Sequence, residues 1–278
     1  MTTVAGLSVQ SPAPGVALVV LDRPGRLNAL DDAMMRAMPT LFDKLAVDPE
    51  VRVVVLTGAH GAFSAGADLA LVGGLPPLSA EALDAFLLQC FQASALLHGM
   101  DKPTIAAING PAAGGGLGLA LACDLRIGGR DASFVSPFIN MGLAPDYGIT
   151  WLLPRVVGHA LALEMAWTGR RVGAEEALAA GLVTRLCDDP LAEALSLAVR
   201  IAAQPAHAVS VTKRLVRDSA PLDLPAALRS EARTAREVLH GKEFGDLWAA
   251  WRTEICGLTN PESDAGQDKP SALATDAR

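Results

Sequence analysis

Short apolar runs alternate with stretches of helical periodicity along the first two thirds of the chain. The runs have the length of buried strands, and most are rich in Val, Ile and Leu; they span residues 16–21, 52–57, 104–108 and 124–128. The longest helical stretch covers residues 80–97, with apolar side chains at helical spacing. Strands that alternate with helices are typical of an α/β domain, which this pattern predicts over residues 15–189.

The pattern changes at Pro190, beyond which every apolar periodicity is helical. Four segments carry it, near residues 190–203, 207–217, 223–239 and 243–254. Residues 190–256 therefore predict a helical domain of the kind that serves as an oligomerisation or lid element. Residues 1–14 are a polar, Pro-interrupted N-terminal extension. Residues 257–278 have no apolar period and predict a disordered tail.

Composition and charge narrow the class of partner. Apolar residues make up 51% of the chain, enough for a large core, and the net charge is −7. That charge argues against nucleic acid or an anionic membrane as the main partner. The four cysteines lie far apart and are expected to be reduced and mostly buried, as in a cytoplasmic protein. No signal peptide, membrane span or metal-ligand spacing is found, so we expect a cytoplasmic protein without a metal.

Two glycine-rich loops carry the clearest functional signal. Residues 63–69 and 109–116 each follow a predicted strand. Small residues after a strand let a ligand approach backbone N–H groups, and two such loops can direct two N–H donors at one oxygen. An oxyanion hole for a thioester carbonyl needs this arrangement. A tight turn that serves packing alone stays open as an alternative, whereas a dinucleotide-binding loop fits poorly because a third glycine is missing at the proper offset.

Five stretches in order resemble the crotonase superfamily, the enoyl-CoA hydratase/isomerase family, from about Gly15 to Trp251. They lie at 21–30, 65–68, 109–124, 142–146 and 173–183. The resemblance implies a spiral of ββα turns with a helical C-terminal trimerisation domain. It also implies an acyl-CoA thioester substrate, a homo-oligomer (trimer or hexamer), and no cofactor, since coenzyme A is part of the substrate.

The same resemblance assigns roles to particular residues. It places the two oxyanion N–H donors at Ala67 and Gly115. Coenzyme A is expected to contact Arg26 and the backbone of Ala65, Asp68 and Leu69. The full set expected to bind the CoA and acyl parts of the substrate is Arg26, Ala65, Gly66, Asp68, Leu69, Gly114, Phe138 and Leu143.

The departures from the family pattern are more informative than the matches. Hydratases of this family carry glutamates at the positions of Gly118 and Phe138, and water addition uses that carboxylate pair. A carboxylate occurs instead at Asp146, in a setting that resembles the epoxyphenylacetyl-CoA isomerase branch, where an aspartate at this place is the acid/base. The alternative for Asp146 is a turn residue, because Pro-Asp-x-Gly is good turn chemistry by itself.

The leading hypothesis is an enoyl-CoA double-bond isomerase in which Asp146 moves a proton on an enolate. Phe138 and Leu143 would desolvate Asp146 and raise its pKa. A hydratase that works with Asp146 alone and a non-catalytic acyl-CoA binder remain alternatives. A Ser64 nucleophile is disfavoured, since no histidine and acid stand in a triad-like context around it. Lys213 and Arg214 would either reach a CoA phosphate or lie on a solvated helix face.

Overall fold

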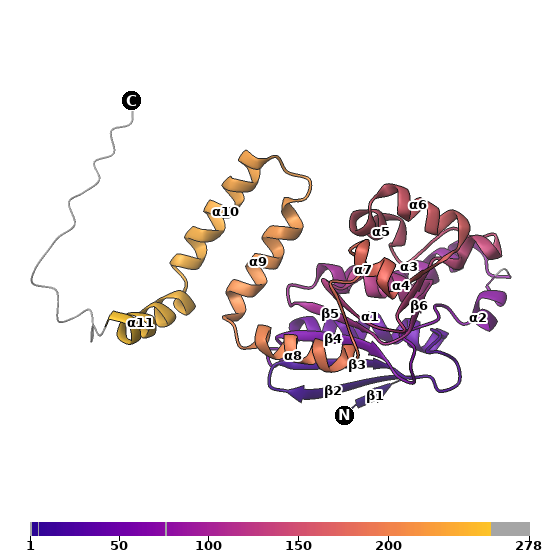
Figure 1. Ribbon diagram of the computed structural model, residues 1–278, viewed down its shortest axis with the longest axis horizontal. Coiled ribbons are helices and arrows are strands. Elements are labelled where there is room, and N and C mark those ends of the chain that lie inside the picture. The colour runs from indigo at the N-terminus through magenta and orange to yellow at the C-terminus, as the bar shows by residue number, and fades with distance from the viewer. Residues whose placement is uncertain (1, 5, 76, 257–278) are drawn as a thin grey trace, which may run out of the picture. The chain divides into compact units, whose positions relative to one another are not determined.

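The computed structural model describes residues 2–4, 6–75 and 77–256, and the tail predicted over 257–278 lies outside them. The chain divides into two compact units, Met1–Arg214 and Leu215–Arg278. The first is an α/β unit and the described part of the second is helical, so the predicted α/β fold class is confirmed (Figure 1).

A seven-stranded sheet forms the centre of the first unit, in the order β1-β2-β3-β4-β5-β7-β10. The strands are β1 (Thr2–Val4), β2 (Leu7–Ala13), β3 (Val16–Leu21), β4 (Val53–Gly58), β5 (Thr104–Ile108), β7 (Leu125–Gly129) and β10 (Arg185–Cys187). β1, β2 and β3 pair antiparallel, and every later neighbour pairs parallel. β4 and β5 are buried along their whole length, as continuous apolar runs are in a sheet covered on both faces.

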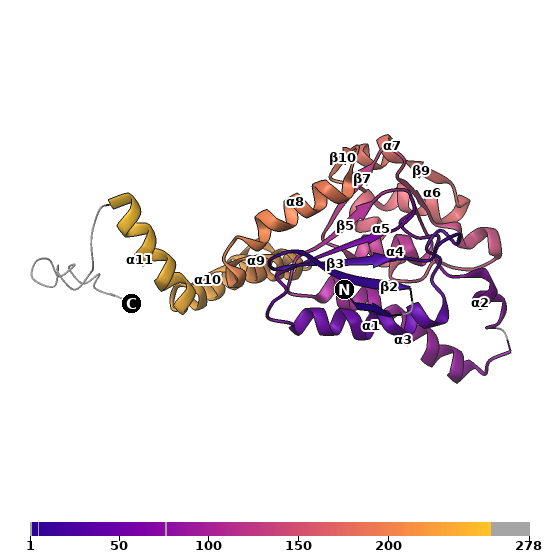
Figure 2. The ribbon, with the colours of Figure 1, turned by 90° about the horizontal axis from the view of Figure 1, so that it is seen from below.

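Helices cover both faces of this sheet. α8 (Pro190–Ala202) packs on one face, where Ala194, Ala198 and Ala202 meet alternate residues of β3, β4 and β5. α1 (Asp32–Val47), α3 (Ala80–Gly99) and α4 (Gly115–Ala122) share the core on the opposite face. Figure 2 shows α8 on one side of the strands and α1 and α3 on the other. All eight residues of α4 are buried, which places its first turn deep inside the unit.

A second, three-stranded sheet supports the loops around α4. It consists of β6 (Pro111–Ala113), β8 (Ser133–Val135) and β9 (Arg171–Gly173), in that order. The remaining elements of the first unit are α2 (Leu69–Gly73), the 3-10 helix η1 (Pro137–Met141), α5 (Ile149–Val157), α6 (His159–Thr168) and α7 (Ala174–Ala179), and α9 (Ala206–Ser219) begins in it. The loop between η1 and α5 contains Asp146.

The structure moves two boundaries expected from the sequence. Residues 7–13, placed in the N-terminal extension, form β2, which pairs with β3 along its length. Its buried end holds Leu7 and the polar Ser8, and its other end, with Ser11 and Pro12, is exposed, so the segment gave a weak strand pattern. α8, placed in the helical domain 190–256, packs instead on the α/β sheet through small residues that repeat every four positions.

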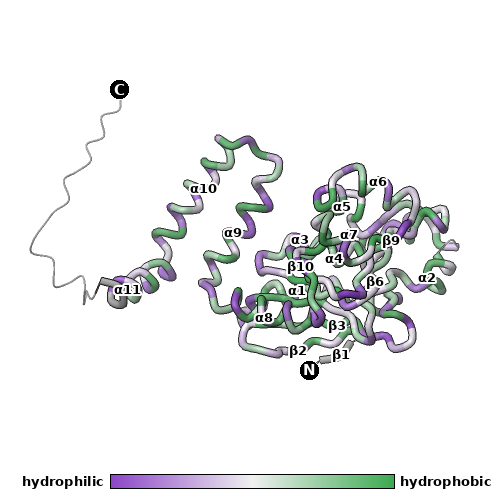
Figure 3. The backbone as a smooth tube through the Cα atoms, viewed as in Figure 1, coloured by the Kyte–Doolittle hydropathy of each residue, from purple (hydrophilic) through white to green (hydrophobic). Residues whose placement is uncertain are grey.

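The second unit contains α10 (Leu224–Leu239) and α11 (Lys242–Cys256). Along α9 and α10, hydrophobic and hydrophilic residues alternate turn by turn (Figure 3). No residue of α10 is buried, and large apolar side chains of the unit are exposed: Val216, Leu222, Leu224, Leu228, Leu239, Leu247, Trp248 and Trp251. On α11 the Trp248 and Trp251 rings stack with centroids 5.0 Å apart.

We expect these apolar faces to be covered by further copies of the chain, in a trimer or hexamer. Light scattering at micromolar concentration should give the mass of at least three chains. Leu224→Lys combined with Leu228→Lys should shift the mass toward the monomer, because two charges would enter the buried contact. Val47→Lys, an equally exposed position on α1, is the matched control and should leave the mass unchanged. A monomeric wild-type protein would contradict this expectation.

No helix in the described ranges is long and apolar enough to cross a membrane.

Candidate functional site

The two glycine-rich loops lie side by side in the structure. Ser64 and Ala112 form a parallel bridge, in which Ala113 N donates to Ser64 O at 2.9 Å and Ser64 N donates to Pro111 O at 3.0 Å. If a Cβ atom were present at Gly66, it would lie 3.2 Å from the nitrogen of Gly115. Backbone pairing therefore fixes the spacing between the loops, and it brings the expected oxyanion residues of both into one place.

The backbone N–H groups of Ala67 in the first loop and Gly115 in the second have no acceptor among the described residues. Ala67 and Leu30 form a parallel β-bridge, in which Leu30 N donates to Gly66 O and Asp68 N donates to Leu30 O. In such a bridge the N–H of the central residue, Ala67, points away from Leu30. Gly115 opens α4, and N–H groups in a first helical turn lack an intrahelical acceptor. The positive end of the α4 dipole adds to the attraction for negative charge at this point.

Close approach explains the glycines. A Cβ at Gly116 would lie 2.6 Å from both the Cβ and the carbonyl oxygen of Ser64, and one at Gly66 would lie 2.7 Å from Ala113 O. Gly66 has φ of 86° and Gly114 has φ of 51°, a region that favours glycine. The glycines therefore allow the backbones of the two loops to touch.

Asn28, which sequence reasoning missed, anchors the first loop. It is buried, has φ of 54°, and its Nδ2 donates to Ala59 O and Ala62 O, both at 2.8 Å. Ser64 Oγ donates to Asn28 O at 2.8 Å and accepts from Gly66 N at 3.2 Å. The Ser64 hydroxyl is thus a buried structural group. This agrees with the expectation that Ser64 is not a nucleophile. The signal available in the sequence was an asparagine in a turn, because asparagine tolerates a left-handed backbone.

The expected CoA-binding residues lie around the first loop. The amides of Ala65 and Asp68 already donate to Leu27 O and Leu30 O, each at 2.9 Å. The Asp68 carboxylate accepts from Arg23 at 2.9 Å and from Ala70 N at 3.0 Å, and these contacts hold its pKa below the ordinary value.

Three side chains are exposed at the edge of the same loop: Arg26, Leu27 and Leu69. They are placed to meet a ligand that approaches the loop from outside. The backbone amide and the carboxylate of Asp68, by contrast, already have hydrogen-bond partners within the protein. The Asp68 amide is therefore not free to bind CoA.

Asp146 lies in the loop between η1 and α5, and its Oδ1 is buried with no hydrogen-bond partner in the described part of the chain. Burial raises its pKa to about 6, against a small opposing effect of its own backbone N–H. Phe138 is buried beside Gly114, with its Cζ 3.8 Å from a Cβ placed there. Leu143, expected to help desolvate Asp146, is itself 44% exposed.

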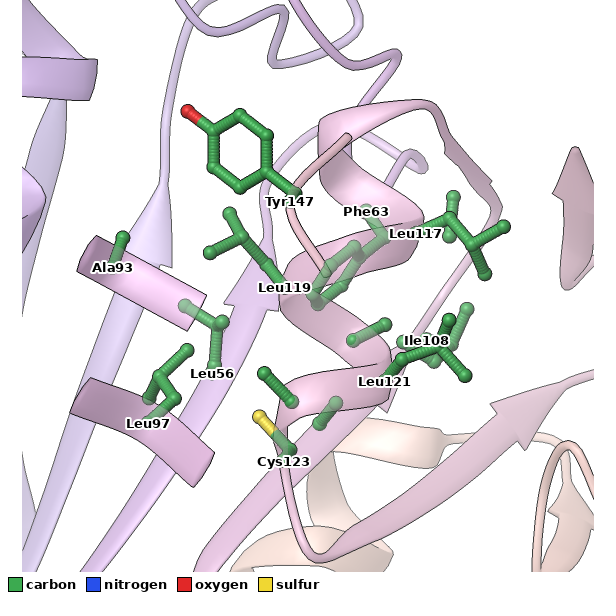
Figure 4. Close-up of a cluster of buried hydrophobic side chains, with 14 of the residues drawn as sticks. Leu56, Phe63, Ala93, Leu97, Ile108, Leu117, Leu119, Leu121, Cys123 and Tyr147 are labelled. Atoms are coloured by element: carbon green, nitrogen blue, oxygen red, sulfur yellow. The ribbon is translucent and has the colours of Figure 1, made fainter. Parts of the chain in front are cut away.

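Tyr147, which sequence reasoning also did not single out, fills the space beside α4. A Cβ at Gly118 would lie 2.4 Å from the Tyr147 Cβ, and one at Gly115 would lie 3.1 Å from two ring carbons. The ring packs edge-to-face against Phe91 with centroids 5.2 Å apart. It is the only tyrosine of the sequence, is 1% exposed, and has φ of 50° (Figure 4). Because Tyr147 contacts Gly115, it connects the Asp146 loop to the glycine-rich loop 109–116.

Tyr147 also decides what residue 118 can be. We expect Gly118→Glu, alone or with Phe138→Glu, to lower the free energy of unfolding by about 1–3 kcal/mol or more, the usual range for overpacking. Glutamate could be accommodated only by displacing Tyr147, so the hydratase pair would not be restored. Thermal melts measure this, with Gly73→Glu as control because a Cβ there meets nothing within 4 Å. Equal melting temperatures for wild type and Gly118→Glu would show that the position has room.

Lys213 has a structural contact that the sequence did not reveal. Its Nζ lies 2.7 Å from Asp124 Oδ2 and donates to Lys102 O at 3.0 Å, and the side chain is 9% exposed. Lys213 is therefore neither on a solvated face nor free to reach a CoA phosphate. Arg214 lies 3.8 Å from Asp101 and is more exposed.

The cysteines with described side chains follow the expectation of a reduced core. Cys90 and Cys123 are buried and unpaired, and burial raises the pKa of their thiols to about 11 and about 12. Within the described ranges, no group of three His, Cys, Asp or Glu side chains is placed to hold a metal ion.

Comparison with known proteins adds to this geometry. Residues 12–246 match the enoyl-CoA hydratase/isomerase family. A probable enoyl-CoA hydratase of Mycobacterium leprae is 42% identical over 225 residues, which cover 76% of each chain. A 4-chlorobenzoyl coenzyme A dehalogenase of an Arthrobacter species is 33% identical, covering 86% of this chain and 88% of its own. The crystal structure of a putative enoyl-CoA hydratase from Streptomyces coelicolor A3(2) superposes with a TM-score of 0.84 at 33% identity, covering 90% of this chain and 92% of that one.

Proposed function

The chain belongs to the enoyl-CoA hydratase/isomerase family of the crotonase superfamily, and on that basis we propose that it is an enoyl-CoA double-bond isomerase. In this proposal the CoA thioester lies across the two glycine loops, with Arg26, Leu69 and the backbone near Ala65 at its CoA end. The acyl chain extends past Gly114 and Phe138 toward Asp146. We place the protein in the epoxyphenylacetyl-CoA isomerase-like branch as part of this proposal, because the setting of Asp146 resembles that branch.

The thioester oxygen accepts the N–H groups of Ala67 and Gly115. Neither amide has an acceptor within the described residues, and the loops that carry them are paired rigidly. As negative charge develops on the oxygen, both bonds strengthen, and one such donor contributes roughly 3–4 kcal/mol in comparable oxyanion holes.

Asp146 carries the proton. Its carboxylate removes the α-proton of a 3-enoyl thioester, and the C–H electron pair becomes part of a conjugated enolate held by the two amides. The protonated Asp146 then returns the proton to the γ-carbon, which leaves the double bond between the α- and β-carbons. A pKa of about 6 suits a group that must take and return a proton near neutral pH.

One observation supports isomerisation over ordinary hydration. Asp146 has one buried carboxylate oxygen without a partner among the described residues, whereas positions 118 and 138 hold Gly and Phe, and Tyr147 fills the space beside Gly118. A proton shuttle needs one carboxylate, while water addition by the usual route needs two. The name of the Mycobacterium leprae relative favours a second candidate, a hydratase that works with Asp146 alone.

Product analysis separates the candidates. The purified protein is incubated with a 3-enoyl-CoA and the matching 2-enoyl-CoA, and products are followed by mass spectrometry and by the ultraviolet absorbance of the conjugated thioester. An isomerase interconverts the two thioesters at constant mass. A hydratase increases the mass of the 2-enoyl thioester by one water. Unchanged thioesters that still bind the protein would support the non-catalytic binder and would contradict both enzymes.

The pH profile follows from the same carboxylate. Asp146 must be ionised to accept the α-proton, so kcat/KM should rise roughly tenfold per pH unit below about pH 6 and level off above it. Burial raises the pKa, so the midpoint should lie well above that of an ordinary aspartate. Initial rates measured between about pH 4.5 and 8 test this. A profile that stays flat down to pH 4.5 would exclude Asp146 as the base.

A further inference from the structure

Tyr147 presents a polar atom that the fold does not use. The side chain is 1% exposed, and its hydroxyl is buried without a hydrogen-bond partner among the residues that the structure describes. A hydroxyl that is buried without a new hydrogen-bond partner loses its bonds to water and destabilises the folded state. Phenylalanine would make the same carbon contacts with Gly115, Gly118 and Phe91 and would avoid this cost. Packing therefore accounts for the ring and not for the hydroxyl.

The direction of the ring places that hydroxyl near the proposed thioester site. The Tyr147 Cβ lies against Gly118, and two ring carbons lie against Gly115, one turn nearer the start of α4. The ring thus runs along α4 toward its N-terminus, as Figure 4 shows beside Leu119. The backbone holds it there at φ of 50°, a conformation that costs a tyrosine energy and that clusters at functional sites.

A second unpaired group stands next to it. Asp146 Oδ1 is also buried without a partner in the described part of the chain, and the two side chains come from neighbouring residues without bonding each other. Burial raises the pKa of the Tyr147 hydroxyl well above its ordinary value, and the neighbouring Cys90 and Asp146 raise it further, so the hydroxyl is a proton donor at neutral pH. A neutral donor and a carboxylate oxygen therefore lie on consecutive residues, and neither has a partner among the described residues.

We infer that Tyr147 is a specificity-determining residue, whose hydroxyl donates a hydrogen bond to an oxygen atom on the acyl chain of the substrate. This rests on the proposed acyl-CoA function. The thioester oxygen already has the amides of Ala67 and Gly115, so the acceptor for Tyr147 is a further oxygen. The substrate class is an acyl-CoA whose chain carries a hydroxyl, carbonyl or ether oxygen. A site built to bond such a group discriminates against a chain that lacks it, because its own donor is then left unpaired.

Binding of unreactive thioesters tests the inference separately from catalysis. Dissociation constants are measured by calorimetry for two pairs, butyryl-CoA with 4-hydroxybutyryl-CoA and pentanoyl-CoA with 4-oxopentanoyl-CoA. Wild type should bind the oxygenated member of at least one pair about tenfold more tightly, which corresponds to ~1.4 kcal/mol. Tyr147→Phe should abolish that preference while binding the plain members as tightly as wild type. Phe91→Leu, which alters the ring contact and keeps the hydroxyl, should retain it.

Two results would overturn the inference. One is the same ratio of affinities in wild type and Tyr147→Phe for both pairs. The other is a Tyr147→Phe protein that melts several degrees lower, since that would assign the hydroxyl to the fold; removal of an unpaired group should leave the melting temperature equal or higher. Failure of the isomerase proposal is visible elsewhere, in product analysis, and does not affect these affinities. A wild-type protein that binds none of the four thioesters would overturn both proposals.

Discussion

Replacing Asp146 with asparagine should lower isomerisation turnover by roughly 100-fold or more, the usual size of a general acid–base contribution. Asparagine keeps the size of the side chain and removes the group that accepts the proton. Acyl-CoA affinity should change little, because the thioester is held by the backbone amides of Ala67 and Gly115. Steady-state kcat and a calorimetric dissociation constant for a saturated acyl-CoA measure the two effects separately.

Asp131→Asn is the matched control, since Asp131 is an exposed carboxylate in the turn between β7 and β8. It should leave both quantities unchanged. An Asp146→Asn enzyme that isomerises at the wild-type rate would remove Asp146 from the mechanism and return it to the role of a turn residue. A large loss of affinity with unchanged kcat would instead make it a binding residue.

The same substitution should make the protein more stable at neutral pH. Burial raises the pKa of Asp146 to about 6, so ionising it in the folded state is unfavourable. Its protonated form favours folding below about pH 4, and that contribution is lost as the pH rises through about 6. Asparagine cannot ionise, so Asp146→Asn should gain up to ~3 kcal/mol in unfolding free energy above pH 7, from the difference between about 6 and the ordinary value.

Urea unfolding of both proteins at several pH values measures this gain at one fixed protein concentration, because oligomers gain apparent stability with concentration. The difference between the proteins should vanish near pH 4 and reach its maximum above pH 7. Loss of turnover together with gain of stability is typical of a residue kept for function. A variant that is less stable than wild type at pH 7 would show that the Asp146 carboxylate stabilises the fold.

The parts of the site that follow local sequence rules were predictable. A glycine loop after a strand is a local pattern, and residues 63–69 and 109–116 lie together as their spacing indicated. Asp146 was singled out because its setting resembles the epoxyphenylacetyl-CoA isomerase branch, where an aspartate at this place is the acid/base. The strands β3, β4 and β5 are continuous apolar runs and begin within one residue of their predicted positions.

The parts that depend on tertiary packing were not predictable. Tyr147 matters because its ring meets Gly115 and Gly118, and nothing local connects residue 147 to residue 118. α8 has the pattern of any amphipathic helix, so its position on the sheet could not be told from that of the helices after it. The sequence places Lys213 on a polar helix face. Its contact with Asp124, which is distant in sequence, is formed only in the folded chain and could not be predicted from the helix alone.

Deuterium transfer tests most directly whether one carboxylate moves the substrate proton. A 3-enoyl-CoA is incubated in deuterated water with wild type or Asp146→Asn, and label in the recovered thioesters is followed by mass spectrometry. Repeated interconversion gives the protonated Asp146 carboxyl many chances to exchange its proton with the solvent. We therefore expect wild type to incorporate deuterium as the 2-enoyl and 3-enoyl forms interconvert, and Asp146→Asn to do so at least about 100-fold more slowly. Incorporation at the wild-type rate by Asp146→Asn would contradict the single-carboxylate mechanism.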